Sequence, residues 1–396
     1  MKCELDCFPA NHDDVQCSPI DMNRKIRSQR DIIKLFGRSV MILCIFVFIS
    51  VLFVLSNPVE NAQPLLLRSA HSLPDTKLIL LWTPYFSDRK WYILPDNGTA
   101  QLSSCTGCRF TNDRSKLNQA VGVVFHGRDI DLNDFPYFQY DYQKWIWYLL
   151  ESPMYTYGLN KMKAKMECYA TYRRDSDIFI PYGEIIPIQF SEMVNSGNNN
   201  ATKVVLSKDT RKPVAWLVSN CKTKSLREEY VKVLQRYIDV DIYGKCGKSC
   251  DNLSLPCHEF IEKNYKFVLA LENSFCKDYV TEKLWNSLKY NVVPIVMGGA
   301  NYSAILPPNS YIDVFNFSSA QNLAEFLKKV SNDDQLYSSY FKWKQSYTIK
   351  ARSMEQDMCS ICRALISPKP CHNHSIKSLS TWWIRDANCF VYKDKN

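Results

Sequence analysis

Residues 265–299 read YKFVLALENSFCKDYVTEKLWNSLKYNVVPIVMGG, and this stretch decides how the rest of the chain is interpreted. An apolar run over 266–271 ends abruptly at Glu272 and Asn273, and a short polar segment follows. A helical pattern opens at Tyr279, and a second apolar run, VVPIVM, precedes two glycines. Strand, loop, helix and strand in this order predict a βαβ unit with parallel strands.

Polar side chains gather where the first predicted strand ends and the helix begins: Glu272, Asn273, Glu282 and Lys283. In parallel sheets, ligands collect at the carboxyl ends of the strands beside the helix N-terminus. Carboxylates suit ribose or sugar hydroxyls, whereas helix N–H groups and a lysine suit phosphate. The sequence therefore predicts a sugar-nucleotide site.

Four separated motifs carry a family resemblance: LENSFCKDYVTEKLW at 271–285, WIWYLLESP at 145–153, YRRDSDIFIPYG at 172–183 and VAWLVSNC at 214–221. In consistent order, from roughly residue 80 to the end, the chain resembles the α1,3-fucosyltransferases, which transfer L-fucose from GDP-fucose to N-acetylglucosamine. The resemblance implies an α/β fold of the GT-B type, with two Rossmann-like domains and a cleft between them. Acceptor recognition is then expected mainly on the first domain and GDP-fucose on the second.

The apolar pattern predicts the elements of both domains. In the first, KLILLW (77–82) and AVGVVFHG (120–127) are typical of strands, and DYQKWIWYLLES (141–152) of a helix. In the second, VAWLVSN and VDIYG are typical of strands. SLREEYVKVLQRYI predicts a helix with Leu226, Tyr230, Val233, Leu234 and Tyr237 on one side.

A polar, asparagine-rich stretch over 191–212 separates the two series of elements. We therefore expect an acceptor-side domain over 77–205, a GDP-fucose-binding domain over 206–350, and a cysteine-rich segment over 351–396 that packs back on the first domain.

An uncharged run, VMILCIFVFISVLFVL, covers residues 40–55 and follows a basic stretch. A buried core helix or a cleaved signal sequence are the alternatives to a membrane anchor. The length of the preceding segment and the positive-inside rule favour an uncleaved type II anchor. We expect a cytoplasmic tail over 1–38, a transmembrane anchor over 39–56 and a stem over 57–76, with the catalytic part in the Golgi lumen.

Two CxxC pairs stand out among sixteen cysteines, Cys105/Cys108 and Cys359/Cys362. Paired CxxC spacing is also that of a four-thiolate zinc site. An oxidising lumen favours disulfides instead. The family resemblance implies that the two pairs crosslink to each other, with the pairing order open.

Six Asn-x-Ser/Thr sequons fit a glycosylated lumenal domain. They begin at Asn97, Asn200, Asn252, Asn301, Asn316 and Asn373.

Inverting fucosyl transfer needs a base for the acceptor hydroxyl and cations for the departing diphosphate. The resemblance identifies Glu151 as the base and Arg227 and Lys283 as the diphosphate-binding residues. It also implies that Glu282 binds ribose and that Asn273 and Tyr279 contact the donor. Asn220 and Glu272 join this set because they stand at predicted strand ends. The alternative for each charged residue is an ordinary solvated surface charge.

Two acidic pairs, Asp175/Asp177 and Asp239/Asp241, resemble the metal-binding DxD motif of other glycosyltransferases, but strand-end or turn hydrogen bonding is the preferred interpretation. The family resemblance implies no metal site and no obligatory cofactor, although Mn²⁺ or Mg²⁺ could stimulate the reaction through the diphosphate. The net charge of +9 is spread along the chain, which argues against nucleic-acid binding. The oligomeric state is not predicted.

One segment departs from the family pattern: where an Asn-Trp-Thr element is common, residues 167–170 read ECYA. This departure motivates an alternative function, a catalytically inactive, lectin-like lumenal protein. A third hypothesis is a GT-B enzyme that uses another nucleotide sugar. For the leading hypothesis, the acceptor is either a Lewis-type antenna or the N-glycan core.

Overall fold

The computed structural model describes residues 76–162, 166–188, 210–251, 253–367, 371 and 379–393. These residues belong to one compact unit, Leu73–Asn396. The predicted tail, the anchor and nearly all of the stem lie outside the described residues, as do the sequons at Asn200, Asn252 and Asn373. Among the described helices, none is long and apolar enough to cross a membrane.

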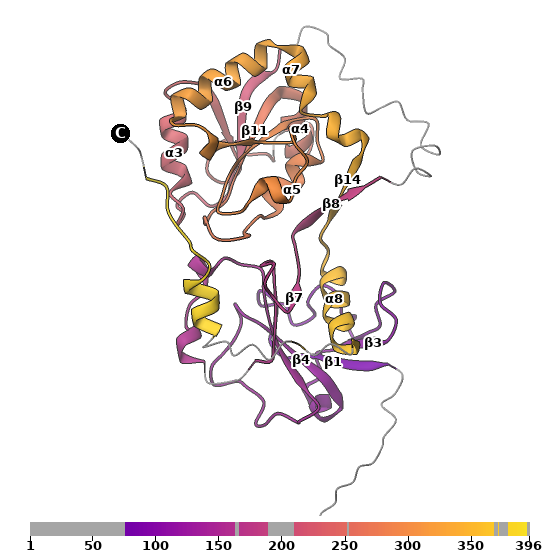
Figure 1. Ribbon diagram of the computed structural model, residues 1–396. Helices are drawn as coiled ribbons and strands as arrows, with labels where there is room; N and C mark the ends of the chain where they lie inside the picture. The colour runs from indigo at the N-terminus through magenta and orange to yellow at the C-terminus, as the bar shows by residue number, and fades with distance from the viewer. Residues whose placement is uncertain are drawn as a thin grey trace, which may run out of the picture. The chain divides into compact units, whose positions relative to one another are not determined.

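The first sheet has seven strands in the order β2-β3-β1-β4-β5-β6-β7 (Figure 1). Every neighbouring pair is parallel except β2–β3. Because both faces of a parallel sheet are covered, its inner strands are apolar almost throughout. The strands are β1 (Lys77–Leu81), β2 (Thr99–Ala100), β3 (Cys108–Thr111), β4 (Ala120–His126), β5 (Lys144–Leu149), β6 (Cys168–Thr171) and β7 (Ile178–Phe179).

The second sheet has five parallel strands in the order β10-β9-β11-β12-β13. Its central unit, β11–α5–β12, confirms the βαβ unit predicted from residues 265–299. The strands are β9 (Lys212–Leu217), β10 (Val240–Tyr243), β11 (Tyr265–Leu271), β12 (Val293–Met297) and β13 (Ile312–Asp313). The helices are α3 (Arg227–Leu234), α4 (Cys257–Asn264), α5 (Glu282–Leu288), α6 (Ala320–Asn332) and α7 (Asp334–Ser339).

A short antiparallel pair, β8 (Gly183–Pro187) with β14 (Tyr347–Ala351), and helix α8 (Met354–Ile366) complete the regular structure. Short helical turns connect these elements. They are η1 (Arg114–Gln119), η2 (Pro153–Tyr155), η3 (Leu159–Lys161), η5 (Tyr302–Ala304), η6 (Val314–Asn316), η7 (Lys342–Gln345) and η8 (Thr381–Arg385).

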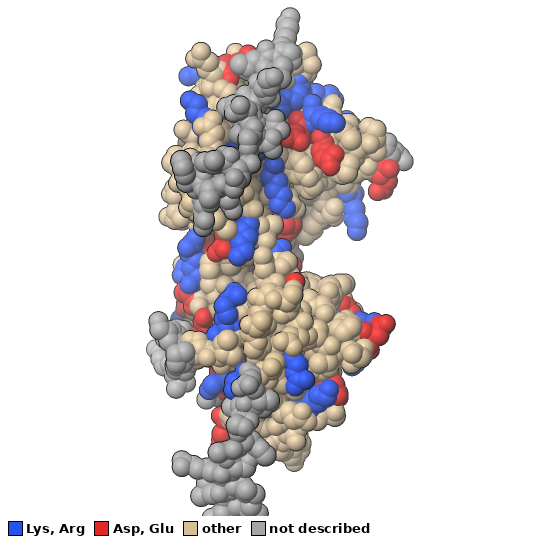
Figure 2. Space-filling view, turned by 90° about the vertical axis from the view of Figure 1, so that its right-hand side faces the viewer, with Lys and Arg blue, Asp and Glu red and all other residues tan. Residues whose placement is uncertain are grey.

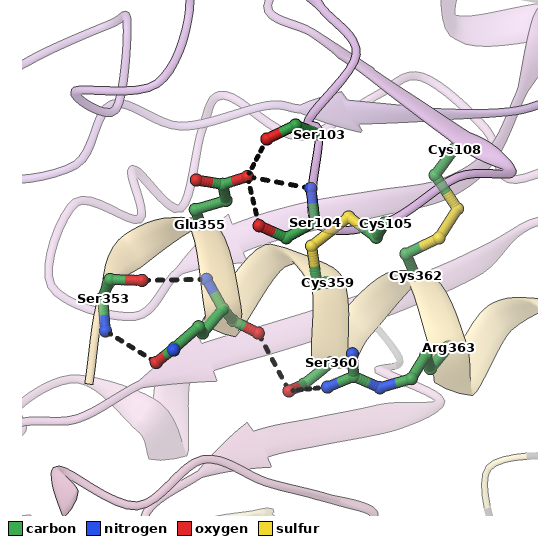
Figure 3. The surroundings of a disulfide bond; sticks show 11 residues. Ser103, Ser104, Cys105, Cys108, Ser353, Glu355, Cys359, Ser360, Cys362 and Arg363 are labelled. Atoms are coloured by element: carbon green, nitrogen blue, oxygen red, sulfur yellow. Dashed lines mark hydrogen bonds between the residues drawn. A yellow bond between two sulfur atoms is a disulfide. The ribbon is translucent and has the colours of Figure 1, made fainter. Parts of the chain in front are cut away.

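Helix α8 is bonded to the first sheet by two disulfides, Cys105–Cys359 and Cys108–Cys362 (Figure 3). The predicted crosslink between the two CxxC pairs is confirmed, and the structure gives its pairing order. The helix begins with a capping box between Ser353 and Gln356, which satisfies two backbone N–H groups. The neighbouring Glu355 accepts hydrogen bonds from Ser103 and Ser104, so the helix start is tied to the same loop.

Four further disulfides pair the other cysteines of the described residues: Cys168–Cys371, Cys221–Cys246, Cys250–Cys257 and Cys276–Cys389. The C-terminal region is therefore bonded both to the first sheet, through β6, and to the loop that follows β11.

The helix predicted over 141–152 is wrong: its apolar part is strand β5, which pairs in parallel with β4 and β6. The run WIWYL is buried at every position, whereas an amphipathic helix would leave one side exposed. Burial on both faces fits a central parallel strand, and Ser152-Pro153 then ends the extended segment in a short helical turn.

Two helix details also differ from the prediction. Helix α5 begins at Glu282, three residues after the expected start at Tyr279, because Asp278 has a left-handed backbone (φ 60°) and Thr281 is the extended N-cap. Helix α3 buries Val231 instead of Val233, and Leu226 and Tyr237 are exposed. The helix ends before Tyr237, so the periodic pattern overestimated its length.

Charges are mixed on the face of the molecule in Figure 2, where Lys and Arg side chains lie among Asp and Glu side chains. On this face the positive charges do not gather into one stripe of the kind that binds a nucleic-acid backbone.

Candidate active site

A cavity of about 350 Å³ lies beyond the carboxyl ends of β9 and β11, beside the start of α5. Every predicted site residue except Glu272 lines it: Glu151, Asn220, Arg227, Asn273, Tyr279, Glu282 and Lys283. A larger hollow of about 590 Å³ lies beside α3 but holds none of these residues. The structure therefore brings the predicted acid–base and phosphate-binding groups to one place, although they come from two sheets.

Glu151 is two residues beyond the end of β5 and partly exposed to the cavity. Its loop is fixed on both sides, because Tyr182 Oη donates to the Leu150 carbonyl (2.7 Å) and the hydroxyls of Ser152 and Ser274 lie 2.6 Å apart. The second contact joins the loop after β5 to the loop after β11. Burial raises the pKa of the Glu151 carboxyl above its usual value, although Arg128 and Lys283 oppose the shift.

Lys283, in the first turn of α5, is held by three oxygen atoms. Its Nζ donates to Thr281 Oγ1 (2.7 Å) and Glu272 Oε2 (3.1 Å), and Glu282 Oε1 lies 3.4 Å away. Burial alone would lower the pKa of Lys283, but Glu272 and Glu282 offset this, so the pKa lies above its ordinary value. The ammonium is therefore charged and faces the cavity.

Glu272 is fully buried and does not line the cavity, so the prediction that it contacts the donor directly is not supported by its position. Its carboxylate accepts hydrogen bonds from the N–H and hydroxyl of Thr281 and from Lys283. It thus caps α5 and orients the lysine.

Arg227 is 2% exposed and begins helix α3. Its guanidinium donates to the carbonyls of Leu271, the last residue of β11, and of Asn220, in the loop after β9. Its Nε has no hydrogen-bond partner among the described residues. Burial lowers the pKa of Arg227, with Glu272 and Glu228 opposing, and an arginine retains its charge in this situation.

Asn273 and Tyr279 form the cavity wall between β11 and α5. Asn273 Oδ1 is buried without a hydrogen-bond partner among the described residues, which is unusual for a polar atom. The Tyr279 ring is 2% exposed and packs on Tyr172 with 5.0 Å between centroids. An unsatisfied acceptor beside a cavity is a candidate ligand contact.

The cavity residues that were not predicted include Tyr182, Ser219 and His258. Tyr182 belongs to the IFIPYG motif and Ser219 to VAWLVSNC, so both stood within motifs already singled out. His258 lies in none of these motifs. The Cys250–Cys257 disulfide and helix α4 bring it to the cavity. Burial, together with Lys289, lowers the pKa of His258, so a neutral imidazole faces the cavity.

None of the residues of the altered segment 167–170 lines the cavity. Cys168, Tyr169 and Ala170 are buried on strand β6, and the Glu167 carboxylate accepts from the Trp145 N–H (2.8 Å). Cys168 pairs with Cys371. The residues that depart from the family pattern therefore contribute to packing and bonding within the first sheet.

One acid of each DxD-like pair makes several hydrogen bonds within the protein. Asp241 receives hydrogen bonds from Lys212, Lys248 and Tyr265. Burial raises the pKa of Asp175, but bonds from Arg173 and Lys277 outweigh it and hold the pKa at about 2. Within the described part of the chain, His, Cys, Asp and Glu side chains form no group that could hold a metal ion.

Comparisons with known proteins cover nearly all of the described residues. Residues 74–183 match the family model for the fucosyltransferase N-terminal part, and residues 207–382 match the model for the C-terminal part of glycosyltransferase family 10 (fucosyltransferase).

Curated relatives match over similar lengths. Alpha-(1,3)-fucosyltransferase C of Drosophila melanogaster is 34% identical over 387 residues, 88% of this chain and 90% of its own. A human 4-galactosyl-N-acetylglucosaminide 3-alpha-L-fucosyltransferase is 36% identical over 302 residues, 74% of this chain and 79% of its own. A crystal structure of an alpha1,3-fucosyltransferase covers 77% of this chain and 94% of its own, with 13% identity and a TM-score of 0.49.

Proposed function

The chain belongs to glycosyltransferase family 10 and is a fucosyltransferase, and we propose that it moves L-fucose from GDP-fucose to the 3-hydroxyl of N-acetylglucosamine in glycoprotein glycans, with inversion at the sugar. The names of two relatives support the 3-linkage, whereas a third, from Bos taurus and 34% identical, is named a 4-alpha-L-fucosyltransferase. The Lewis-type antenna and the N-glycan core are the acceptors to compare.

One observation carries the proposal: Glu151, from the first sheet, lines the same cavity as Arg227 and Lys283, from the second. A transferase needs a proton acceptor and a cationic diphosphate site within reach of one bound donor. Burial raises the pKa of the partly exposed Glu151, which makes it a stronger base than a free glutamate.

In the proposed mechanism, Glu151 accepts the proton of the acceptor hydroxyl as that oxygen attacks the anomeric carbon of fucose. The bond from that carbon to the diphosphate oxygen breaks, and GDP leaves with the bonding electrons. Arg227 and Lys283 stabilise the charge on the departing diphosphate, and Glu282 receives the ribose hydroxyls. Asn220, Asn273 and Tyr279 complete the donor site.

We further propose the GT-B arrangement, with the domains divided near residues 205 and 350, and a type II Golgi membrane protein with a lumenal catalytic part. Disulfides throughout the described residues support an oxidising compartment. The apolar run 40–55 supports the anchor.

Incubation of the soluble ectodomain with GDP-fucose and both acceptor glycans tests the proposal. We expect a fucosylated product whose linkage analysis gives the 3-position of N-acetylglucosamine. Folded protein that binds GDP but transfers to neither glycan would contradict the proposal and favour the lectin-like alternative. A larger thermal shift with UDP than with GDP would favour another nucleotide sugar.

A further inference from the structure

Residues 387–392, which we call the C-terminal strap, lie along two loops of the second sheet. Three backbone hydrogen bonds hold them: Lys277 N–H donates to the Ala387 carbonyl (2.8 Å), Phe390 N–H to Phe275 (2.9 Å) and Tyr392 N–H to Ser225 (2.9 Å). In Figure 1 this yellow segment runs beside α3 toward the chain end.

A disulfide and aromatic packing reinforce these bonds. Cys389 of the strap is bonded to Cys276, which is fully buried. Phe390 packs on Phe275 (5.4 Å between centroids), and Tyr392 packs on Tyr230 of α3 (5.3 Å). The strap is thus fixed to the loop after β11 by a covalent bond and to the start of α3 by a backbone bond.

Both loops carry residues of the donor cavity. Ser225 lies two residues before Arg227, and Phe275 lies two residues after Asn273. The loops also bond to each other, because Ser225 N–H donates to the Asn273 carbonyl (3.2 Å) and Ser225 Oγ donates to the Glu272 carbonyl (2.9 Å). The strap therefore bonds to residues that stand two positions from Arg227 and Asn273, the two groups that face the proposed donor cavity.

The loop around Cys276 has little freedom to adjust by itself. A Cβ atom added at Gly299, beyond the end of β12, would lie 2.6 Å from the backbone N and O of Cys276. The loop is packed against the glycines that follow β12 on one side and bonded to the strap on the other, so a change in the strap is transmitted to Asn273 and Arg227 through the backbone.

We propose that the C-terminal strap, closed by Cys276–Cys389, is a positioning element for the donor site: it sets the spacing of the loops that carry Arg227 and Asn273 and thereby the affinity for GDP. The inference rests on the proposed donor site. Its parts are positioning residues, because none of the six residues 387–392 lines the cavity.

The first test removes the disulfide in the ectodomain with Cys276→Ala and Cys389→Ala together, which leaves no free thiol. The matched control is Cys168→Ala with Cys371→Ala, which removes a disulfide that closes a longer segment (separation 203 against 113) and whose two cysteines do not line the cavity. Because the control opens the longer loop, the loop-entropy model predicts that it loses at least as much stability as the strap variant does.

We expect the dissociation constant for GDP and the KM for GDP-fucose to rise by about tenfold in the strap variant only, because small displacements of binding groups weaken binding strongly. The acceptor KM should stay unchanged in both variants. Equal GDP affinity in the wild type and the strap variant overturns the inference, as does an equal loss in the control. A wild-type ectodomain that binds no GDP would instead overturn the proposed function.

A second variant pair covers the case in which the disulfide variant does not fold. Tyr392→Pro removes the N–H that donates to Ser225 and keeps the disulfide, whereas Val391→Pro keeps the N–H groups of both Phe390 and Tyr392. We expect weaker GDP binding for Tyr392→Pro than for Val391→Pro. Equal GDP affinity in these two variants would contradict the positioning role.

Discussion

Lys283 Nζ lies 3.1 Å from Glu272 Oε2, and the two side chains differ in depth, since 23% of Lys283 but only 1% of Glu272 is exposed. The same carboxylate accepts from the Thr281 N–H at the start of α5. A buried glutamate thus sets the position of a cation that faces the donor cavity. Strand β11 ends at Leu271, so Glu272 and Asn273 are the first two residues of the loop that forms the proposed phosphate site.

Replacing Glu272 with Gln should lower both stability and GDP affinity. Glutamine keeps an oxygen that can accept from Thr281 but leaves Lys283 without its buried counter-charge. Because Lys283 retains some solvent contact, we expect a cost of about 3 kcal/mol in the free energy of unfolding, the lower end for a broken buried pair. Urea denaturation and GDP calorimetry measure the two effects. The control Glu282→Gln, whose side chain is 58% exposed, should change stability by less than about 0.5 kcal/mol.

Glu151→Gln should lower kcat by about 10² to 10⁴, the usual contribution of a general base. The change preserves the shape of the side chain, so the dissociation constant for GDP should stay near the wild-type value. Steady-state kinetics with both substrates, together with calorimetry, separate the two quantities. A variant that keeps its kcat would show that another group takes the proton.

Sequence patterns predicted the second sheet better than the first, and there is a physical reason for the difference. Strand β11, helix α5 and strand β12 differ in periodicity and are separated by polar residues, so their order was clear. The run at β5 is aromatic and buried throughout, and periodicity alone does not separate a short buried strand from a buried helix.

All predicted site residues except Glu272 line one cavity, but how deeply each is buried could not be foreseen. Glu272 and Glu282 are both glutamates near one helix start, yet the first is buried beneath the lysine and the second is exposed. His258 reaches the cavity because of the Cys250–Cys257 disulfide and helix α4, which the spacing of residues in the sequence does not specify. The disulfide partner of Cys276 could not be predicted from the sequence either. Such positions depend on tertiary packing, which a single sequence records only indirectly.

The pH dependence of kcat should have an acidic limb above the value of a free glutamate. Burial favours the neutral carboxylic acid of Glu151, so its pKa is raised, and the base is lost as the pH falls through that raised value. Arg128 opposes the shift. Arg128→Gln should therefore move the limb to still higher pH, and a limb that moves to lower pH would contradict this assignment.

Arg227→Lys should weaken GDP binding by about tenfold or more and also lower the free energy of unfolding. The guanidinium joins the ends of β9 and β11 by donating to Asn220 and Leu271, and a lysine has no planar fork to reach both carbonyls and a phosphate. Each lost charged hydrogen bond costs about 1.5–3 kcal/mol, so a marked fall in the urea midpoint is expected. The control is Arg236→Lys, at an exposed position just after α3. If Arg227→Lys bound GDP as well as this control does, the Arg227 guanidinium would have only a structural role between the two strands. The diphosphate would then be bound by Lys283 and the start of α5 alone.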